Sequence, residues 1–106
     1  DVNSSRLAPE EERSIRSFIG STANEFAGMR IRIEGNTDIT GSRELNIKLS
    51  KDRAQAVANY LINEYRFDPN RFIIVGNGPD KPIASNETEA GRAKNRRTDF
   101  EFLPAN

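Results

Sequence analysis

Two hydrophobic periodicities meet within one stretch of this chain, and together they restrict its fold. Residues 30–34 alternate charged and apolar side chains, which is the pattern of a strand with one buried face, and Gly35 ends that pattern. Ser50 is a suitable helix N-cap, and apolar side chains then recur at helical spacing as far as about Tyr65. A strand that leads through a loop into a helix is a building unit of α/β proteins.

The rest of the chain continues this alternation. A proline followed by three glutamates predicts the start of a helix over residues 9–26. A continuous apolar run at residues 72–75 predicts a strand that is covered on both faces. Thr88 is expected to cap a short helix that continues through Ala93, and alternation returns in a last strand at residues 98–103. Strands and helices in alternation predict an α/β domain.

The composition excludes several classes of function. The chain has 106 residues, which is enough for a single domain with one core, and no apolar run approaches the length of a membrane span. It contains neither cysteine nor histidine, so disulfides, thiolate chemistry and the commonest general base and metal ligand are absent. Sixteen basic and sixteen acidic residues give zero net charge, so no overall field attracts nucleic acid. We therefore expect no metal site, no cofactor and no catalytic residue.

Two charged side chains stand out at the junction between the first predicted strand and its helix. Asp38 lies in a glycine-bracketed loop, and Arg53 is expected in the first turn of the helix that follows. A carboxylate and a guanidinium in one crevice suit a zwitterion such as an amino-acid head group, and the N–H groups of a helix N-terminus would add donors for an anion. The alternative is an intramolecular salt bridge between Asp38 and Arg53 that ties the loop to the helix.

The same stretch resembles a known family. The matching residues are Gly35, Asn36, Thr37, Asp38, Gly41, Ser42, Asn46, Leu49, Ser50, Arg53, Ala54 and Val57, and a second signature, GRxxNRR, matches residues 91–97. The segment Pro82-Ile83-Ala84-Ser85-Asn86 fits the loop before this second signature. In this order and spacing, over roughly residues 30 to 102, the chain is similar to the OmpA-like (OmpA C-terminal) peptidoglycan-binding domain family.

The resemblance implies a fold, a ligand and a location. The fold would be an α/β (α+β) two-layer sandwich with helices packed on one face of a small mixed β-sheet, and residues 1–106 would be a single domain excised from a larger protein, with its first strand clipped. The ligand would be the meso-diaminopimelate residue of a peptidoglycan stem peptide, held non-covalently by Asp38 and Arg53. The domain would be periplasmic and would anchor its parent protein or the outer membrane to the cell wall, with membrane attachment only through a tether outside this chain. Asn36 departs from the family, which usually has a structural histidine at this position.

Other residues are expected to assist this site. Thr37 and Asn46 are secondary candidates for ligand contact, although both residue types also serve local turn chemistry. The resemblance implies a supporting role for Asn95 and Arg97 near the ligand, with a surface salt-bridge network as the alternative. Asp1 lies in a segment similar to the family's loop before the first helix and is also expected to support the site.

The sequence gives less support to two other functional classes. An enzyme acting on peptidoglycan would need zinc or two spaced carboxylates, and neither is evident around Asp38, whose neighbour Arg53 would lower its pKa. A protein- or nucleic-acid-interaction domain could use the basic segment GRAKNRR of residues 91–97, although acidic residues flank it and no aromatic platform accompanies it. The residues after Arg97 carry no dimerisation signal, so no oligomeric state is predicted.

Overall fold

A computed structural model of the chain describes residues 9, 12–13, 15–17 and 28–104. The described residues before position 18 are helical, in agreement with the helix expected over residues 9–26. Ile15, one of them, is only 2% exposed and belongs to the core. The remainder of that expected helix lies outside the described residues, as does Asp1.

Three strands form a mixed sheet in the order β2-β1-β3. The central strand β1 (Arg30–Asn36) pairs in parallel with β2 (Phe72–Gly78) and antiparallel with β3 (Arg97–Leu103). A parallel pair requires a long crossover, and the chain supplies one in the helix α2 (Arg43–Tyr65). The expected mixed sheet is confirmed.

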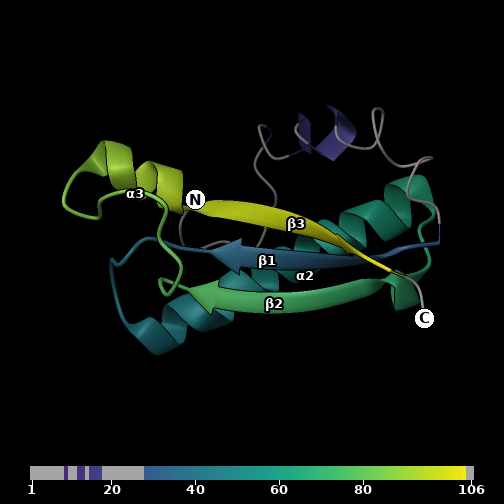
Figure 1. Cartoon of the computed structure of the whole chain (residues 1–106), viewed down its shortest axis with the longest axis horizontal. Coiled ribbons are helices and arrows are strands. Elements are labelled where there is room, and N and C mark those ends of the chain that lie inside the picture. The colour runs from purple at the N-terminus through teal and green to yellow at the C-terminus, as the bar shows by residue number, and fades with distance from the viewer. Residues whose placement is uncertain (1–8, 10–11, 14, 18–27, 105–106) are drawn as a thin grey trace.

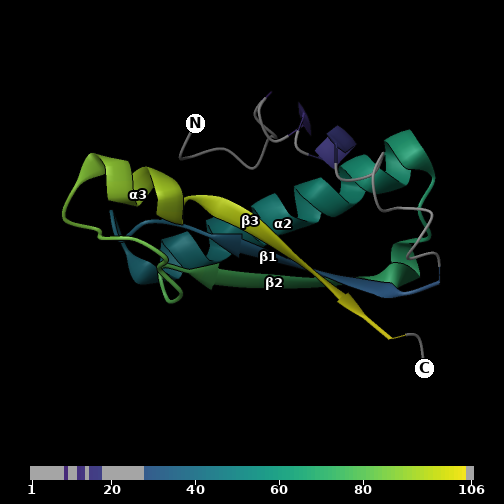
Figure 2. The same ribbon diagram turned by 45° about the horizontal axis from the view of Figure 1, so that its top comes forward.

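The helices and the sheet form two layers. Helix α2 lies across one face of the sheet in both views, and α3 (Glu89–Asn95) lies beyond the end of the sheet where β1 and β2 stop and β3 begins (Figures 1 and 2). The core between the layers is aliphatic, since the inward side chains of β1 meet one stripe of α2. Its fully buried members are Ile15, Ile31, Ile33, Ala54, Val57, Ala58 and Leu61. The predicted two-layer sandwich is therefore confirmed.

Helix α2 begins two turns earlier than the sequence pattern predicted. Its N-cap is Ser42, whose Oγ accepts a hydrogen bond from the Leu45 backbone N–H at 3.0 Å, and it continues to a left-handed C-cap at Arg66 (φ 60°). The prediction of Ser50 as the N-cap was wrong, because Ser50 lies inside the helix and is fully buried. None of the helices in the described part of the chain is long and apolar enough to cross a membrane.

Ser50 instead connects α2 to the sheet. Its Oγ donates to the Ile47 carbonyl at 2.9 Å and accepts from the Gly78 backbone N–H at 2.9 Å. Two glycines allow the helix to come this close. A Cβ at Gly35 would lie 2.0 Å from the Ser50 carbonyl oxygen, and one at Gly76 would lie 2.7 Å from the Ile47 carbonyl oxygen. The first half of α2 therefore packs directly on the backbone at the ends of β1 and β2.

The remaining elements agree with the sequence patterns in type but differ in detail. Strand β2 extends to Gly78, and most of its side chains are only half-buried, so the expectation of a strand covered on both faces was wrong. The reason is that β2 is an edge strand of the described sheet. Thr88 does cap α3, because its Oγ1 accepts from the Gly91 backbone N–H at 3.0 Å, and α3 continues to Asn95.

The close contact at Gly35 generates a stability prediction. We expect Gly35→Ala to lower the free energy of unfolding by about 3 kcal/mol or more, because the new methyl group would displace helix backbone, which cannot move without repacking the core. Urea denaturation followed by circular dichroism measures this change. Gly28→Ala is the control: Gly28 has a positive φ (88°), but nothing lies within 4 Å of the added Cβ, so the substitution should cost only about 1–2 kcal/mol. Equal effects of the two substitutions would contradict the packing argument.

Candidate functional site

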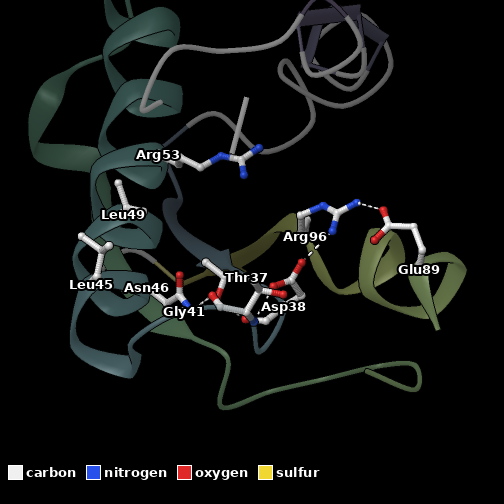
Figure 3. Close-up of a pocket in the computed structure, with 10 residues that line it drawn as sticks. Thr37, Asp38, Gly41, Leu45, Asn46, Leu49, Arg53, Glu89 and Arg96 are labelled. Atoms are coloured by element: carbon white, nitrogen blue, oxygen red, sulfur yellow. Dashed lines mark hydrogen bonds and ion pairs between the residues drawn. The ribbon is translucent and has the colours of Figure 1, made fainter. Parts of the chain in front are cut away.

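A pocket of about 510 Å³ opens where the loop after β1, the first half of α2 and the helix α3 come together (Figure 3). The loop contributes Thr37, Asp38, Thr40 and Gly41, and α2 contributes Leu45, Asn46, Leu49 and Arg53. Glu89 at the start of α3 and Arg96 at its C-cap complete the lining. The structure thus brings together four of the residues that the sequence singled out: Thr37, Asp38, Asn46 and Arg53.

Local hydrogen bonds fix the loop that carries Asp38. The Thr37 backbone N–H donates to the Gly78 carbonyl at 2.9 Å, and the Thr37 hydroxyl donates to the Asp38 carbonyl at 2.8 Å. The Thr40 backbone N–H donates to Asp38 Oδ1 at 2.8 Å, which sets the orientation of the carboxylate. Asn46 Nδ2 donates to the Thr40 carbonyl at 2.8 Å and so ties the loop to α2. In these bonds Thr37 and Asn46 act on the loop, while both also line the pocket.

The ion-pair partner of Asp38 is Arg96. Asp38 Oδ2 accepts from Arg96 Nη1 at 2.6 Å, and the Asp38 side chain is 9% exposed (Figure 3). Burial alone would raise the pKa of this carboxyl, but the Thr40 N–H and the Arg96 guanidinium outweigh burial and hold the pKa below its ordinary value. The alternative prediction, an internal salt bridge between Asp38 and Arg53, named the wrong arginine, because the structure pairs Asp38 with Arg96.

Arg96 also holds a second carboxylate. Its Nη2 donates to Glu89 Oε2 at 2.6 Å, so one guanidinium connects Asp38 to Glu89. Hydrogen bonds from Arg96 and then Arg92 lower the pKa of Glu89, and those to Glu89 and Asp38 raise the pKa of Arg96. The sequence reasoning did not place Arg96 or Glu89 in the site. The sequence signal that could have identified Arg96 was the Asn-Arg-Arg triplet of residues 95–97, from which Arg97 was predicted to support the site and Arg96 was not.

Arg53 lines the pocket from the middle of α2. Because the helix begins at Arg43, Arg53 is not in its first turn. The prediction that N–H groups of the helix N-terminus lie beside Arg53 as donors for an anion was therefore wrong. The guanidinium nevertheless extends over the same pocket as the Asp38 carboxylate (Figure 3). A cation and an anion therefore face one cavity, as a zwitterionic ligand requires.

The predicted supporting residues Asn95 and Arg97 are not among the residues that line the pocket. Asn95 is completely buried, and its Oδ1 accepts from the Ile83 and Ala84 backbone N–H groups at 2.8 and 3.0 Å. Its Nδ2 donates to the Ala84 carbonyl and to Asn86 Oδ1. Asn95 thus fixes the loop before α3 and does not belong to a surface network. Arg97 turns away, donating to the Lys81 carbonyl at 2.9 Å and pairing with Asp99 at 3.1 Å.

Asn36, which replaces the family's usual histidine, is 2% exposed and does not line the pocket. Its Nδ2 donates to the Glu34 carbonyl at 3.1 Å, and its Oδ1 accepts from Asn77 Nδ2 at 3.1 Å. These bonds lie within the sheet and its edge, and they agree with a structural role for this position.

The arginines of the basic segment are occupied by internal partners. Arg92 donates to the Asn86 carbonyl at 2.9 Å and pairs with Glu89 at 3.2 Å, and Arg96 and Arg97 have the partners described above. These contacts leave little of the segment's positive charge uncompensated, which disfavours a phosphate-binding surface. In the part of the chain that the structure describes, no three acidic side chains converge as the ligands of a metal ion would.

Comparison with known proteins assigns the chain to a family. The family model described as "OmpA family" matches residues 1–96, so the chain belongs to the OmpA family. The resemblance that the motifs indicated is confirmed.

Individual relatives agree with this assignment. Outer membrane protein Omp38 of Acinetobacter baumannii is 41% identical over 97 residues, which cover 92% of this chain and 27% of that protein. Peptidoglycan-binding protein ArfA of Mycobacterium tuberculosis is 49% identical over 71 residues, which cover 67% of this chain and 22% of that protein. The crystal structure of the peptidoglycan-associated lipoprotein from Burkholderia pseudomallei superposes with a TM-score of 0.83 at 28% identity, covering 97% of this chain and 86% of that one. The chain therefore corresponds to about a quarter of the length of the first two proteins.

The lowered pKa of Asp38 predicts how stability depends on pH. The charged carboxylate stabilises the folded state above the unfolded pKa of about 3.9, and this contribution is lost as the pH falls through the lower folded-state pKa. We therefore expect the difference in free energy of unfolding between wild type and Asp38→Asn to be larger at about pH 7 than at about pH 2.5. Urea denaturation at the two pH values measures it.

The control for this experiment is Asp52→Asn, which removes an exposed carboxylate that pairs with Lys48 on α2. It should change the free energy of unfolding by about 0.5 kcal/mol or less. A difference between wild type and Asp38→Asn that does not change with pH would show that the bonds from Thr40 and Arg96 do not stabilise the charged form.

Proposed function

We propose that this domain binds peptidoglycan non-covalently, through the meso-diaminopimelate residue of a stem peptide, and thereby attaches the protein that carries it to the cell wall. The observation that supports the proposal is that one pocket is lined by the Asp38 carboxylate and the Arg53 guanidinium. The side chain of meso-diaminopimelate ends in a carbon that bears both an ammonium and a carboxylate. Asp38 would accept the ammonium, and Arg53 would donate to the carboxylate.

The names of the relatives support the same ligand class. ArfA is described as peptidoglycan-binding, and the Burkholderia protein as peptidoglycan-associated. The matched segment accounts for most of the latter chain, so the likeness extends over nearly the whole of that fold. Since Omp38 is an outer membrane protein, we further propose a periplasmic location for this domain, attached to the outer membrane or another envelope component.

The pocket would discriminate between two kinds of stem peptide. A lysine in place of diaminopimelate keeps the ammonium but lacks the adjacent carboxylate, so it could not accept a hydrogen bond from the Arg53 guanidinium. A hydrogen bond to a charged group contributes about 1.5–3 kcal/mol, so its loss would lower the affinity by about tenfold or more. Diaminopimelate-type peptidoglycan would therefore be preferred over lysine-type peptidoglycan.

Binding without catalysis fits the charges in the pocket. A general acid in bond cleavage needs a raised pKa, whereas the pKa of Asp38 is lowered. A single head-group contact gives modest affinity, but many copies along one wall attach firmly through multivalency. The proposed role is therefore that of an anchor.

The experiment is an amide-shift titration of the isotopically labelled domain with two stem tripeptides, one ending in meso-diaminopimelate and the other in lysine. We expect shifts clustered around residues 36–53 with the first peptide and much smaller shifts with the second. Asp38→Ala and Arg53→Ala should each weaken binding by about tenfold or more, because each leaves one ligand charge unpaired.

Lys51→Ala is the matched control, since it removes an exposed cation of α2 that does not line the pocket, and it should leave the affinity unchanged. An unchanged spectrum without ligand would show that each variant keeps its fold. If the wild-type domain gave no shifts with the diaminopimelate peptide, or if the Lys51 variant weakened binding as much as the two pocket variants, the proposal would be wrong.

A further inference from the structure

One guanidinium in the pocket is shared between two carboxylates. Arg96 Nη1 lies 2.6 Å from Asp38 Oδ2, and Arg96 Nη2 lies 2.6 Å from Glu89 Oε2 (Figure 3). The three side chains differ in exposure, with Asp38 at 9%, Arg96 at 25% and Glu89 at 66%. Glu89 therefore holds the outer end of a guanidinium whose inner end contacts the buried carboxylate.

This arrangement creates a difficulty for a cationic ligand group. Asp38 has room for another donor, because a carboxylate oxygen can accept two hydrogen bonds and, among the described residues, Thr40 donates to one of its oxygens and Arg96 to the other. The obstacle is charge, since an ammonium that reaches Asp38 also comes close to the guanidinium of Arg96. Two cations on one carboxylate repel each other, and a second anion nearby offsets that repulsion.

Glu89 is that second anion. Among the residues that the structure describes, the charged side chains that line the pocket are Asp38, Glu89, Arg53 and Arg96, two of each sign, so their charges cancel. Without the charge of Glu89, these described side chains would carry one net positive charge and would favour an anion over a zwitterion. We propose that Glu89 is a positioning residue that sets the specificity of this pocket: it shares Arg96 with Asp38 and so allows Asp38 to accept a ligand ammonium. The proposal rests on the proposed function.

The surroundings of Glu89 fit this role. Arg92, which does not line the pocket, donates from Nε to Glu89 Oε1 at 3.2 Å, so both oxygens of Glu89 are held by arginines. These two hydrogen bonds, first from Arg96 and then from Arg92, also lower the pKa of Glu89, which keeps it charged at neutral pH. Glu89 begins α3 next to the Thr88 cap, so the backbone that carries it is fixed.

The test compares Glu89→Gln with wild type on two stem tripeptides. The first ends in meso-diaminopimelate, and the second ends in 2-aminopimelate, whose side chain keeps the distal carboxylate but lacks the ammonium. We expect Glu89→Gln to weaken binding of the first peptide by about threefold to fivefold, a modest factor because Glu89 is 66% exposed and therefore screened. Binding of the second peptide should not weaken.

Two further variants separate a specific role from a structural one. Because Glu89 acts through Arg96, Glu89→Gln should have no effect on affinity when it is added to Arg96→Gln. Glu89→Asp, which keeps the charge, should restore part of the wild-type affinity. Glu87→Gln is the control, since it neutralises an exposed carboxylate of the same segment that does not line the pocket, and its affinity should equal that of wild type.

The outcomes distinguish this inference from the function on which it rests. If wild type binds neither peptide, the proposed function fails and this inference fails with it. If wild type binds the diaminopimelate peptide but Glu89→Gln binds it equally well, only the role of Glu89 is refuted. Equal weakening for both peptides, or an undiminished effect in the Arg96→Gln background, would also refute that role, because each result would mean that Glu89 acts on structure and not on the charge balance of the ammonium site.

Discussion

The direct contact between the first half of α2 and the strand ends is the constraint on which the site depends. Gly35 and Gly76 leave no side chain between helix and sheet, and Ser50 accepts a hydrogen bond from the backbone of Gly78 at the end of β2. This contact sets the depth at which α2 lies over the end of the sheet. Asn46 of α2 therefore reaches the loop that carries Asp38, and Arg53 of the same helix lines the same pocket. A larger residue at either glycine would move α2 away from the sheet and from the loop that carries Asp38.

The elements of this fold could be predicted from local pattern, but the start of α2 could not. The alternating pattern of β1 and β3 can be recognised within a few residues, and so can the Thr88 cap of α3. The first two turns of α2 instead bury Asn46 and Ser50, polar residues that resemble loop and cap signals. Their burial becomes favourable only when the sheet edge and the loop supply hydrogen-bond partners. These partners come from tertiary structure, which the local sequence does not show. A prediction based on the apolar stripe therefore places the start of the helix too late.

The candidate site divides in the same way. A zwitterionic ligand could be predicted because Asp38 and Arg53 lie close together in the sequence and carry opposite charges. The ion-pair partner of Asp38 could not be predicted in this way, because Arg96 lies 58 residues further along the chain. Adjacent arginines of one motif also take opposite directions, since α3 ends between them. Arg96 is the C-cap of α3 and lines the pocket, while Arg97 begins β3 and donates to the Lys81 carbonyl outside the pocket. No periodicity in the sequence distinguishes the two, because the distinction arises where a helix changes into a strand.

The internal partners of Asp38 have a consequence for binding. A buried carboxylate that waited for its ligand would destabilise the folded domain, and the bonds from Thr40 and Arg96 remove that penalty before any ligand arrives. The same bonds reduce what a ligand ammonium gains, since it meets a carboxylate whose charge is already partly compensated. Under the proposed function, a pocket of this kind would bind each stem peptide weakly. Weak, reversible contacts repeated along a polymer suit an anchor better than one tight contact does, because attachment by many copies holds while each copy can still exchange.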